Sequence, residues 1–107
     1  MELELAINRF LNFCRTEKAY SQHTLLSYET ALSQFREYIK FEKIPDNDIS
    51  GYETDDIRPF LGWLHDKEYG KSSLRLKIVA VKSFFRYCAK KGFITNNPSS
   101  LISSPKR

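Results

Sequence analysis

The residues with the clearest chemical potential in this sequence are lysines and arginines that recur between positions 71 and 91. Wound as a helix at 100° per residue, five of them fall within an arc of roughly 100°. A line of cations on one helix face is suited to binding the phosphates of a polyanion. We call this line the basic seam; it consists of Lys71, Arg75, Lys82, Arg86 and Lys90.

Charge is unevenly divided along the chain. Residues 1–70 contain eight Lys and Arg and all thirteen acids, whereas residues 71–107 contain nine Lys and Arg and no acid. The first part therefore carries a net charge of −5 and the second +9. This asymmetry indicates a nucleic-acid partner more clearly than the overall charge of +4 does.

A second set of candidate binding residues lies on the helix predicted from residue 22 to 40. Four polar, uncharged side chains recur there at i, i+4, i+7 and i+11, on the flank opposite the apolar face: His23, Ser27, Thr30 and Gln34. Such side chains can donate to phosphates or contact base edges, and they place no carboxylate against DNA. The alternative interpretation is an ordinary solvated helix face.

The sequence lacks the residue pairs that catalysis requires. His23 and His65 fall on different predicted helices with no evident partner, and neither cysteine has an adjacent base. The four scattered glycines form no phosphate-binding loop. None of the six tyrosines has the cluster of Arg and His that phosphoryl transfer would need. We therefore expect that this chain is not an enzyme on its own.

Metal, cofactor and disulfide chemistry are not predicted either. The acidic turn between residues 41 and 53 lacks the ligand spacing of an EF-hand, so we expect no metal site and no cofactor. Cys14 and Cys88 occupy apolar helical positions, which indicates buried thiols in a reducing compartment. Because the sequence shows no signal peptide or long apolar run, we expect a cytoplasmic protein without membrane contact.

Apolar periodicity predicts an all-α domain of four helices. Ser21 is the expected N-cap of the second helix, and Gly92 should end the fourth. Pro59 is acceptable in the third helix only because it lies in or just past the first turn. The predicted helices span residues 2–18, 22–40, 54–68 and 71–91.

Several finer features are also predicted. Ser72 or Ser73 is the expected N-cap of the fourth helix, and Ser99 should cap a short extra helical turn that includes Ile102. The first helix either packs on the rest of the domain or docks against a neighbouring subunit. The Trp63 side chain either belongs to the core or contacts a partner. The far side of the fourth helix should be filled by Leu76, Ala80, Phe84 and Tyr87.

Two runs of residues, taken with these helices, resemble a known family. The run from Ser21 to Tyr28, SQHTLLSY, followed by Leu32 and Phe35, resembles the second helix of the N-terminal core-binding domain of tyrosine recombinases, the phage integrases and Xer-type recombinases. The fourth helix resembles that domain more strongly, and the exit at residues 104–106 is similar too. The matching positions there are Ser73, Leu74, Lys77, Ile78, Ala80, Val81, Lys82, Ser83, Phe84, Phe85, Arg86 and Tyr87, then Gly92, Phe93, Ile94, Asn97 and Pro98.

The resemblance implies a four-helix, SAM-like bundle that clamps one face of duplex DNA through its second and fourth helices. It implies a core-binding domain over residues 1–102, and residues 103–107 would begin the linker to an absent C-terminal catalytic domain. Its implied partners are double-stranded DNA, that catalytic domain and neighbouring protomers in a DNA-bound tetramer, near the nucleoid. It assigns DNA contacts to Thr24, Tyr28, Ser73, Lys77 and Lys82.

Combining the family positions with the helix faces gives the full candidate DNA-binding set. Two departures from the family favour phosphate anchoring over base readout: Glu29 and Thr30 follow Tyr28 where basic residues are common, and lysine replaces arginine at Lys77 and Lys82. The alternative function is a helical protein-interaction module whose basic face binds an acidic partner. The candidate residues are His23, Thr24, Ser27, Tyr28, Ser73, Arg75, Lys77, Lys82, Arg86 and Lys90.

Overall fold

A computed structural model describes residues 1–103 of the chain, and all the regular elements in that part are helices. The predicted all-α class and the long helices are confirmed. A one-turn 3-10 helix, Ile49–Gly51, was not anticipated. The α-helices are α1 (Leu3–Thr16), α2 (Gln22–Phe41), α3 (Thr54–Ile57), α4 (Pro59–His65) and α5 (Lys71–Lys90).

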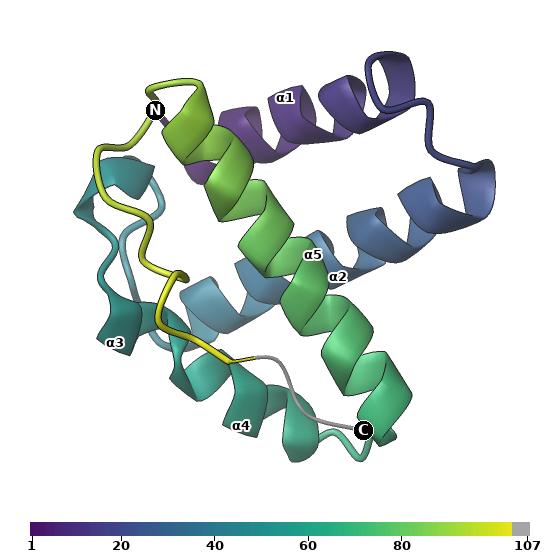
Figure 1. The fold of residues 1–107 in the computed structure, drawn as a ribbon. Coiled ribbons are helices and arrows are strands. Elements are labelled where there is room, and N and C mark those ends of the chain that lie inside the picture. The colour runs from purple at the N-terminus through teal and green to yellow at the C-terminus, as the bar shows by residue number, and fades with distance from the viewer. Residues whose placement is uncertain (104–107) are drawn as a thin grey trace.

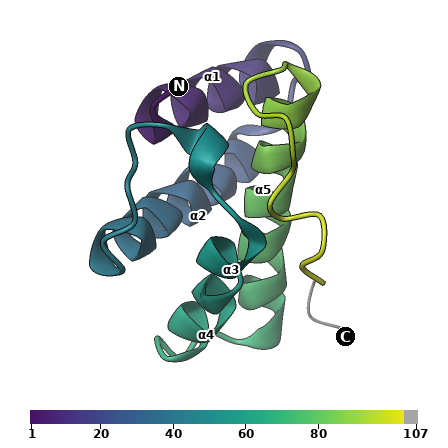
Figure 2. The same ribbon diagram turned by 90° about the vertical axis from the view of Figure 1, so that its left-hand side faces the viewer.

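Helices α2 and α5 cross at the centre of the molecule, and the other helices pack around this crossing (Figure 1). Helix α1 packs on both of them beside the N-terminal half of α2. Helices α3 and α4 lie toward the opposite end of α2, where α4 contacts both long helices (Figures 1 and 2). The crossing therefore brings the start of α2 and the exposed side of α5 onto one surface.

The third predicted helix is broken into two, which corrects the expectation of one continuous helix. Helix α3 ends at Ile57, the Arg58 N–H donates to the Thr54 carbonyl, and α4 begins at Pro59. Because proline has no N–H, Pro59 cannot continue the hydrogen-bond ladder of α3, but it fits the first position of a new helix. The fold remains a four-helix bundle whose third helix is interrupted.

Helix ends follow local chemistry in most places. The Ser21 hydroxyl accepts from the Thr24 N–H, as predicted, and Gly92 adopts the left-handed conformation with φ of 80° just after α5. The N-cap of α5 is Gly70 instead of Ser72 or Ser73, because the helix begins at Lys71, two or three residues earlier than a serine cap would place it.

Residues 93–103 run back along α5 and cover part of it (Figure 2). The predicted extra helical turn is a series of hydrogen-bonded turns at residues 98–101, and Asn97 caps it instead of Ser99. The Asn97 side chain accepts from the Ser99 N–H and hydroxyl, and Ser99 and Ile102 are buried. The expected linker lies outside the described residues beyond Ser103.

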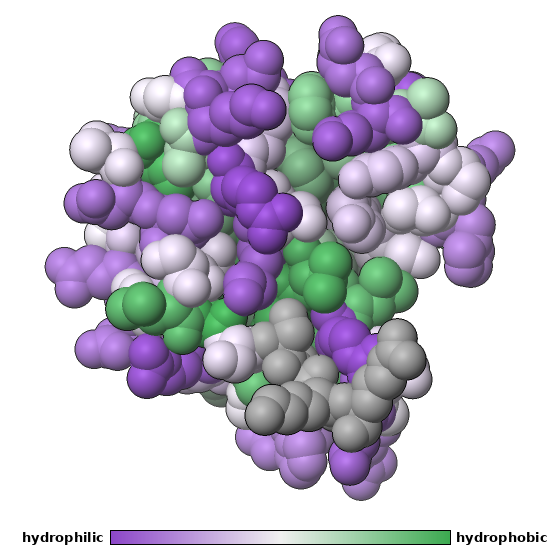
Figure 3. All heavy atoms as spheres, viewed as in Figure 1, coloured by the Kyte–Doolittle hydropathy of each residue, from purple (hydrophilic) through white to green (hydrophobic). Residues whose placement is uncertain are grey.

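The surface is mostly hydrophilic on the face shown in Figure 3, with apolar side chains over the crossing of α2 and α5. Within residues 1–103, none of the helices combines the length and the apolar character needed to cross a membrane.

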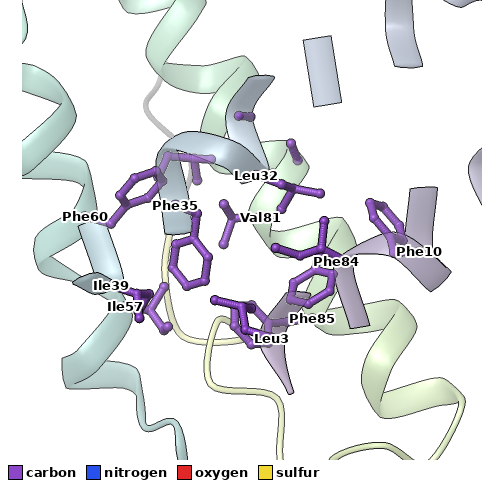
Figure 4. Close-up of a cluster of buried hydrophobic side chains, with 14 of the residues drawn as sticks. Leu3, Phe10, Leu32, Phe35, Ile39, Ile57, Phe60, Val81, Phe84 and Phe85 are labelled. Atoms are coloured by element: carbon purple, nitrogen blue, oxygen red, sulfur yellow. The ribbon is translucent and has the colours of Figure 1, made fainter. Parts of the chain in front are cut away.

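Aromatic rings from four helices fill the core between α2 and α5 (Figure 4). Phe35 of α2 is fully buried, and its ring meets those of Phe60 and Phe85 edge to face, at centroid distances of 5.3 and 5.8 Å. Such a core ring is worth about 3–5 kcal/mol against alanine. Cys14 and Cys88 are buried free thiols, as predicted, and burial raises the pKa of Cys88 to about 12.

Candidate nucleic-acid interface

The basic seam runs along the solvent side of α5, but its members differ in exposure. Lys71, Arg86 and Lys90 are exposed, whereas Arg75 and Lys82 are half-buried. Helix α5 contains no acid, so the field along it is positive from end to end.

Lys82 differs from the other residues of the basic seam because its side chain makes a hydrogen bond within the domain. Its ammonium donates to the backbone carbonyl of Ile102, in the segment that runs back along α5. A carbonyl oxygen at this position satisfies part of the charged group's hydrogen-bonding need. Lys82 therefore holds the C-terminal segment against the helix, while the phosphate-binding role expected from the sequence stays a prediction.

A groove between the first turns of α2 and of α5 brings together candidate residues that are about fifty positions apart. The groove measures about 220 Å³, and within residues 1–103 it is lined by no Asp or Glu. We call it the α2–α5 groove; its lining residues are His23, Leu26, Ser27, Thr30, Ser73, Leu76 and Lys77. Five of these seven were singled out in the sequence, either among the four polar residues of the second helix or among the candidate DNA-binding residues.

Lys77 lines the α2–α5 groove, and an aromatic ring lies beside its ammonium. Its ammonium lies 4.7 Å from the centroid of the Tyr69 ring, a cation–π distance. The Tyr69 hydroxyl in turn accepts from the Gln34 side-chain amide. Lys77 therefore lies on the side of α5 that borders α2.

Gln34 departs from the predicted polar line. It is half-buried and bonded to Tyr69, and its Oε1 atom is buried without a hydrogen-bond partner. The remaining line on α2 consists of His23 and Thr30, which are exposed, and Ser27, which is half-buried and whose hydroxyl donates to the His23 carbonyl. Gln34 does not line the groove; it contacts Tyr69, whose ring lies beside Lys77.

A second hollow, of about 370 Å³, lies between α1, the α1–α2 loop and the C-terminal half of α5. We call it the aromatic hollow. Four cations surround it, on a floor formed mainly by aromatic rings. Its lining residues are Phe10, Phe13, Cys14, Lys18, Tyr20, Ser83, Arg86, Tyr87, Lys90 and Lys91.

The cations of the aromatic hollow lie close to its rings. The Lys91 ammonium is 5.9 Å from the ring centroids of both Phe13 and Tyr87, and that of Lys18 is 6.0 Å from Phe13. Together with Arg86 and Lys90 they give a concave, positively charged site. The sequence interpretation missed Lys18, Tyr20 and Lys91, because they meet only when α1 is folded against α5.

Two candidates at the start of α2 have structural roles. Tyr28 is only 8% exposed and lies against the rings of Phe10 and Tyr20, at 6.1 and 5.7 Å. Burial raises the pKa of Tyr28, and a hydrogen bond with Ser83 partly opposes the rise. Thr24 belongs to the helix cap, since its N–H and hydroxyl both bond with the Ser21 hydroxyl.

The acids at the start of α3 are not among the residues that line these two hollows. Asp55 and Asp56 belong to α3, which packs near the end of α2, where the Tyr38 hydroxyl donates to the Asp56 carbonyl. The described residues contain no cluster of three or more His, Cys, Asp and Glu that could hold a metal ion. The arrangement suits binding a polyanion over α5 and the start of α2.

Comparison with known proteins identifies the family. Residues 7–92 match the model of the phage integrase N-terminal SAM-like domain. The chain is 29% identical over 100 residues to the tyrosine recombinase XerC of Halalkalibacterium halodurans, covering 94% of this chain and 32% of that protein. It is 31% identical over 98 residues to XerC of Listeria innocua, covering 92% and 32%.

Solved structures show the same fold at lower identity. A lambda integrase dimer bound to a COC′ core site superposes on all of this chain with a TM-score of 0.82 at 20% identity, over 29% of its own length. The chain spans about a third of the length of the XerC relatives. The expected SAM-like fold is confirmed, and the chain belongs to the phage integrase N-terminal SAM-like domain family, the N-terminal part of tyrosine recombinases.

Proposed function

We propose that this chain is the DNA-binding domain of a site-specific tyrosine recombinase, which holds one face of a duplex half-site through α2 and α5 during DNA integration or recombination. One observation carries the proposal: α5, which contains no acid, and the first turn of α2, which also contains none, border one surface. A duplex presents phosphates along both edges of a major groove that admits a helix, so it matches such a surface.

In this proposal the two hollows contact different parts of the duplex. Arg86, Lys90 and Lys91 at the aromatic hollow contact phosphates, and Lys71 extends the positive surface at the other end of α5. The α2–α5 groove, with one cation and small polar side chains, faces base edges. Tyr28 supports this surface from within, because its ring is buried beneath Tyr20 and beside Ser83.

The rest of the recombinase supplies the chemistry in this proposal. Residues 1–102 form the core-binding domain, and residues 103–107 begin the linker to a C-terminal catalytic domain of the same polypeptide. The chain is then not an enzyme on its own, and it acts in the cytoplasm at the nucleoid, beside neighbouring recombinase protomers in a DNA-bound tetramer. The XerC relatives, about three times as long as this chain, support this division.

The test reverses charge at the aromatic hollow. We expect the Arg86→Glu/Lys90→Glu variant to bind a labelled duplex at least tenfold more weakly than the unchanged chain near 0.1 M salt, since two phosphate contacts become repulsions. If four to six cations meet phosphates, the log–log salt slope of the unchanged chain should be roughly −4 to −5. Fluorescence anisotropy at several low salt concentrations measures both, because one clamp alone binds weakly.

The control carries the same charge change at the far end of α2. Lys40→Glu/Lys43→Glu lies on exposed positions after the crossing, away from both hollows. It should leave affinity within about threefold, since neither lysine lines a hollow that is proposed to contact the duplex. Equal losses in the two variants would show that only net charge matters, and unchanged binding by Arg86→Glu/Lys90→Glu would reject the proposed face.

A further inference from the structure

Two exposed leucines stand on the proposed DNA-binding surface, where neither packs in the core. Leu26 of α2 is 61% exposed and Leu76 of α5 is 43% exposed. Leu76 was expected to fill the far side of α5, and the structure corrects this, because Leu76 lies exposed in the groove that α5 forms with α2. A single exposed leucine needs no explanation, but these two come from different helices and line the same groove.

The rim of the α2–α5 groove limits what can occupy it. Around the two leucines stand His23, Thr30 and Ser73, all exposed, and the ammonium of Lys77. Among the described residues, no carboxylate lines it. An apolar centre with polar donors, acceptors and one cation at its rim complements a surface that carries methyl groups, hydrogen-bonding edges and nearby negative charge.

The major-groove edge of an A·T pair has this composition. Thymine presents its C5-methyl group beside the O4 acceptor, and adenine presents a donor and an acceptor, with phosphates on both sides. Methyl groups in the major groove are read by apolar contact. A protein partner would also cover leucines, but the absence of acids over the whole of α5 favours a polyanion.

We propose that Leu26 and Leu76 form an apolar contact for thymine methyl groups, so that the α2–α5 groove prefers A·T pairs at the base steps that face it. This inference rests on the proposed function, since it names what one part of the DNA-binding surface reads. The basic seam supplies affinity for any duplex, and the leucines add a preference that depends on sequence.

The test removes only the methyl group from the DNA. The probes are two duplexes of about 30 base pairs with the same A·T-rich sequence, one with thymine and one with deoxyuridine at every thymine position. We expect the unchanged chain to bind the thymine duplex about fourfold more tightly for each buried methyl, from the value of one buried apolar carbon. Leu26→Ala/Leu76→Ala should bind both duplexes equally, with the salt slope unchanged.

Leu101→Ala is the matched control, because Leu101 is 75% exposed and lies outside the groove. It should keep the full difference between the duplexes. Both leucine variants change surface positions, and a thermal melt checks that they remain folded.

Each outcome decides a separate point. Equal binding of both duplexes by the unchanged chain overturns the thymine contact but leaves the proposed function standing, because a duplex is still bound. A difference that survives Leu26→Ala/Leu76→Ala assigns methyl reading to other residues and also overturns the inference. If neither duplex is bound at low salt, the proposed function fails as well. If sedimentation shows self-association that the double variant abolishes, the groove binds a second copy of the chain instead.

Discussion

The two hollows that border α5 differ in what they offer a ligand. The aromatic hollow is lined by four cations and by aromatic rings that include Phe10, Phe13 and Tyr87, whereas the α2–α5 groove has a single cation, three small hydroxyl side chains, a histidine and two leucines. Both belong to one helix and one surface. They nevertheless differ in the type of interaction that dominates, charge in the first and shape with hydrogen bonding in the second.

This difference teaches how a small helical domain can separate affinity from selectivity. Contacts between cations and phosphates act on every duplex and weaken with salt, whereas contacts with base edges depend on sequence and are little affected by salt. Because the two hollows lie at opposite halves of α5, changes at one end should alter one property and leave the other.

Neutralising the aromatic hollow should cause the largest loss. We expect Arg86→Ala/Lys90→Ala to weaken binding about 10- to 100-fold near 0.1 M salt, and to make the log–log salt slope shallower by about 2, because two counterion-releasing contacts are lost. Thr30→Ala/Ser73→Ala in the groove should leave the slope unchanged and alter the ranking of different duplexes. Titrations of several duplex sequences at three salt concentrations measure both quantities. A shallower slope in the groove variant would mean that the two hollows are not separate.

The comparison also shows what the sequence can predict. The helices, the Ser21 cap and the stop at Gly92 depend on residues close in the chain, and local patterns predicted them. The central place of α5 agrees with its many buried apolar residues. The break before Pro59 also has a local cause, because proline has no N–H to continue the helix. The sequence interpretation missed this break because it accepted Pro59 within the first turn of one continuous helix.

The parts that the sequence did not predict depend on how the helices cross. Lys82 meets the Ile102 carbonyl only because the C-terminal segment folds back along α5. The aromatic hollow needs Lys18 and Tyr20 from a loop in which Ala19 has φ of 51°, a conformation that no pattern signals. Leu26 did carry a signal, since at 100° per residue it lies nearly opposite the buried face of α2. Such an apolar residue on the solvent side marks a candidate contact.

Removing the Lys82 ammonium should give a smaller effect, on stability instead of binding. Lys82→Met keeps much of the aliphatic side chain but loses the hydrogen bond to the Ile102 carbonyl. Since the group is half-buried and partly hydrated, we expect a loss of about 1 kcal/mol and a Tm lower by roughly 4–8 °C. The salt slope should not change if Lys82 holds the C-terminal segment in the bound state too.

The exposed Lys40→Met is the control for this change, with an expected effect within about 0.5 kcal/mol. Thermal melts and salt titrations of both variants give the comparison. A normal Tm together with a salt slope shallower by about 1 would show that Lys82 binds phosphate, as the family resemblance implies, and the boundary between the hollows would then have to be moved.

The smallest expected effect comes from Tyr69, which holds the one cation of the α2–α5 groove. Tyr69→Leu removes both the ring beneath Lys77 and the hydroxyl that accepts from Gln34, whereas Tyr69→Phe removes only the hydroxyl. A cation–π contact is worth about 0.5–1 kcal/mol, so we expect Tyr69→Leu to weaken duplex binding roughly two- to fivefold. Tyr69→Phe should keep most of the affinity, because the ring remains under the ammonium. Binding titrations of Tyr69→Leu in a Lys77→Ala background complete the double-mutant cycle. An additional loss of affinity there would show that Tyr69 acts on DNA independently of Lys77. No additional loss would show that the Tyr69 ring acts by positioning the Lys77 ammonium in the groove.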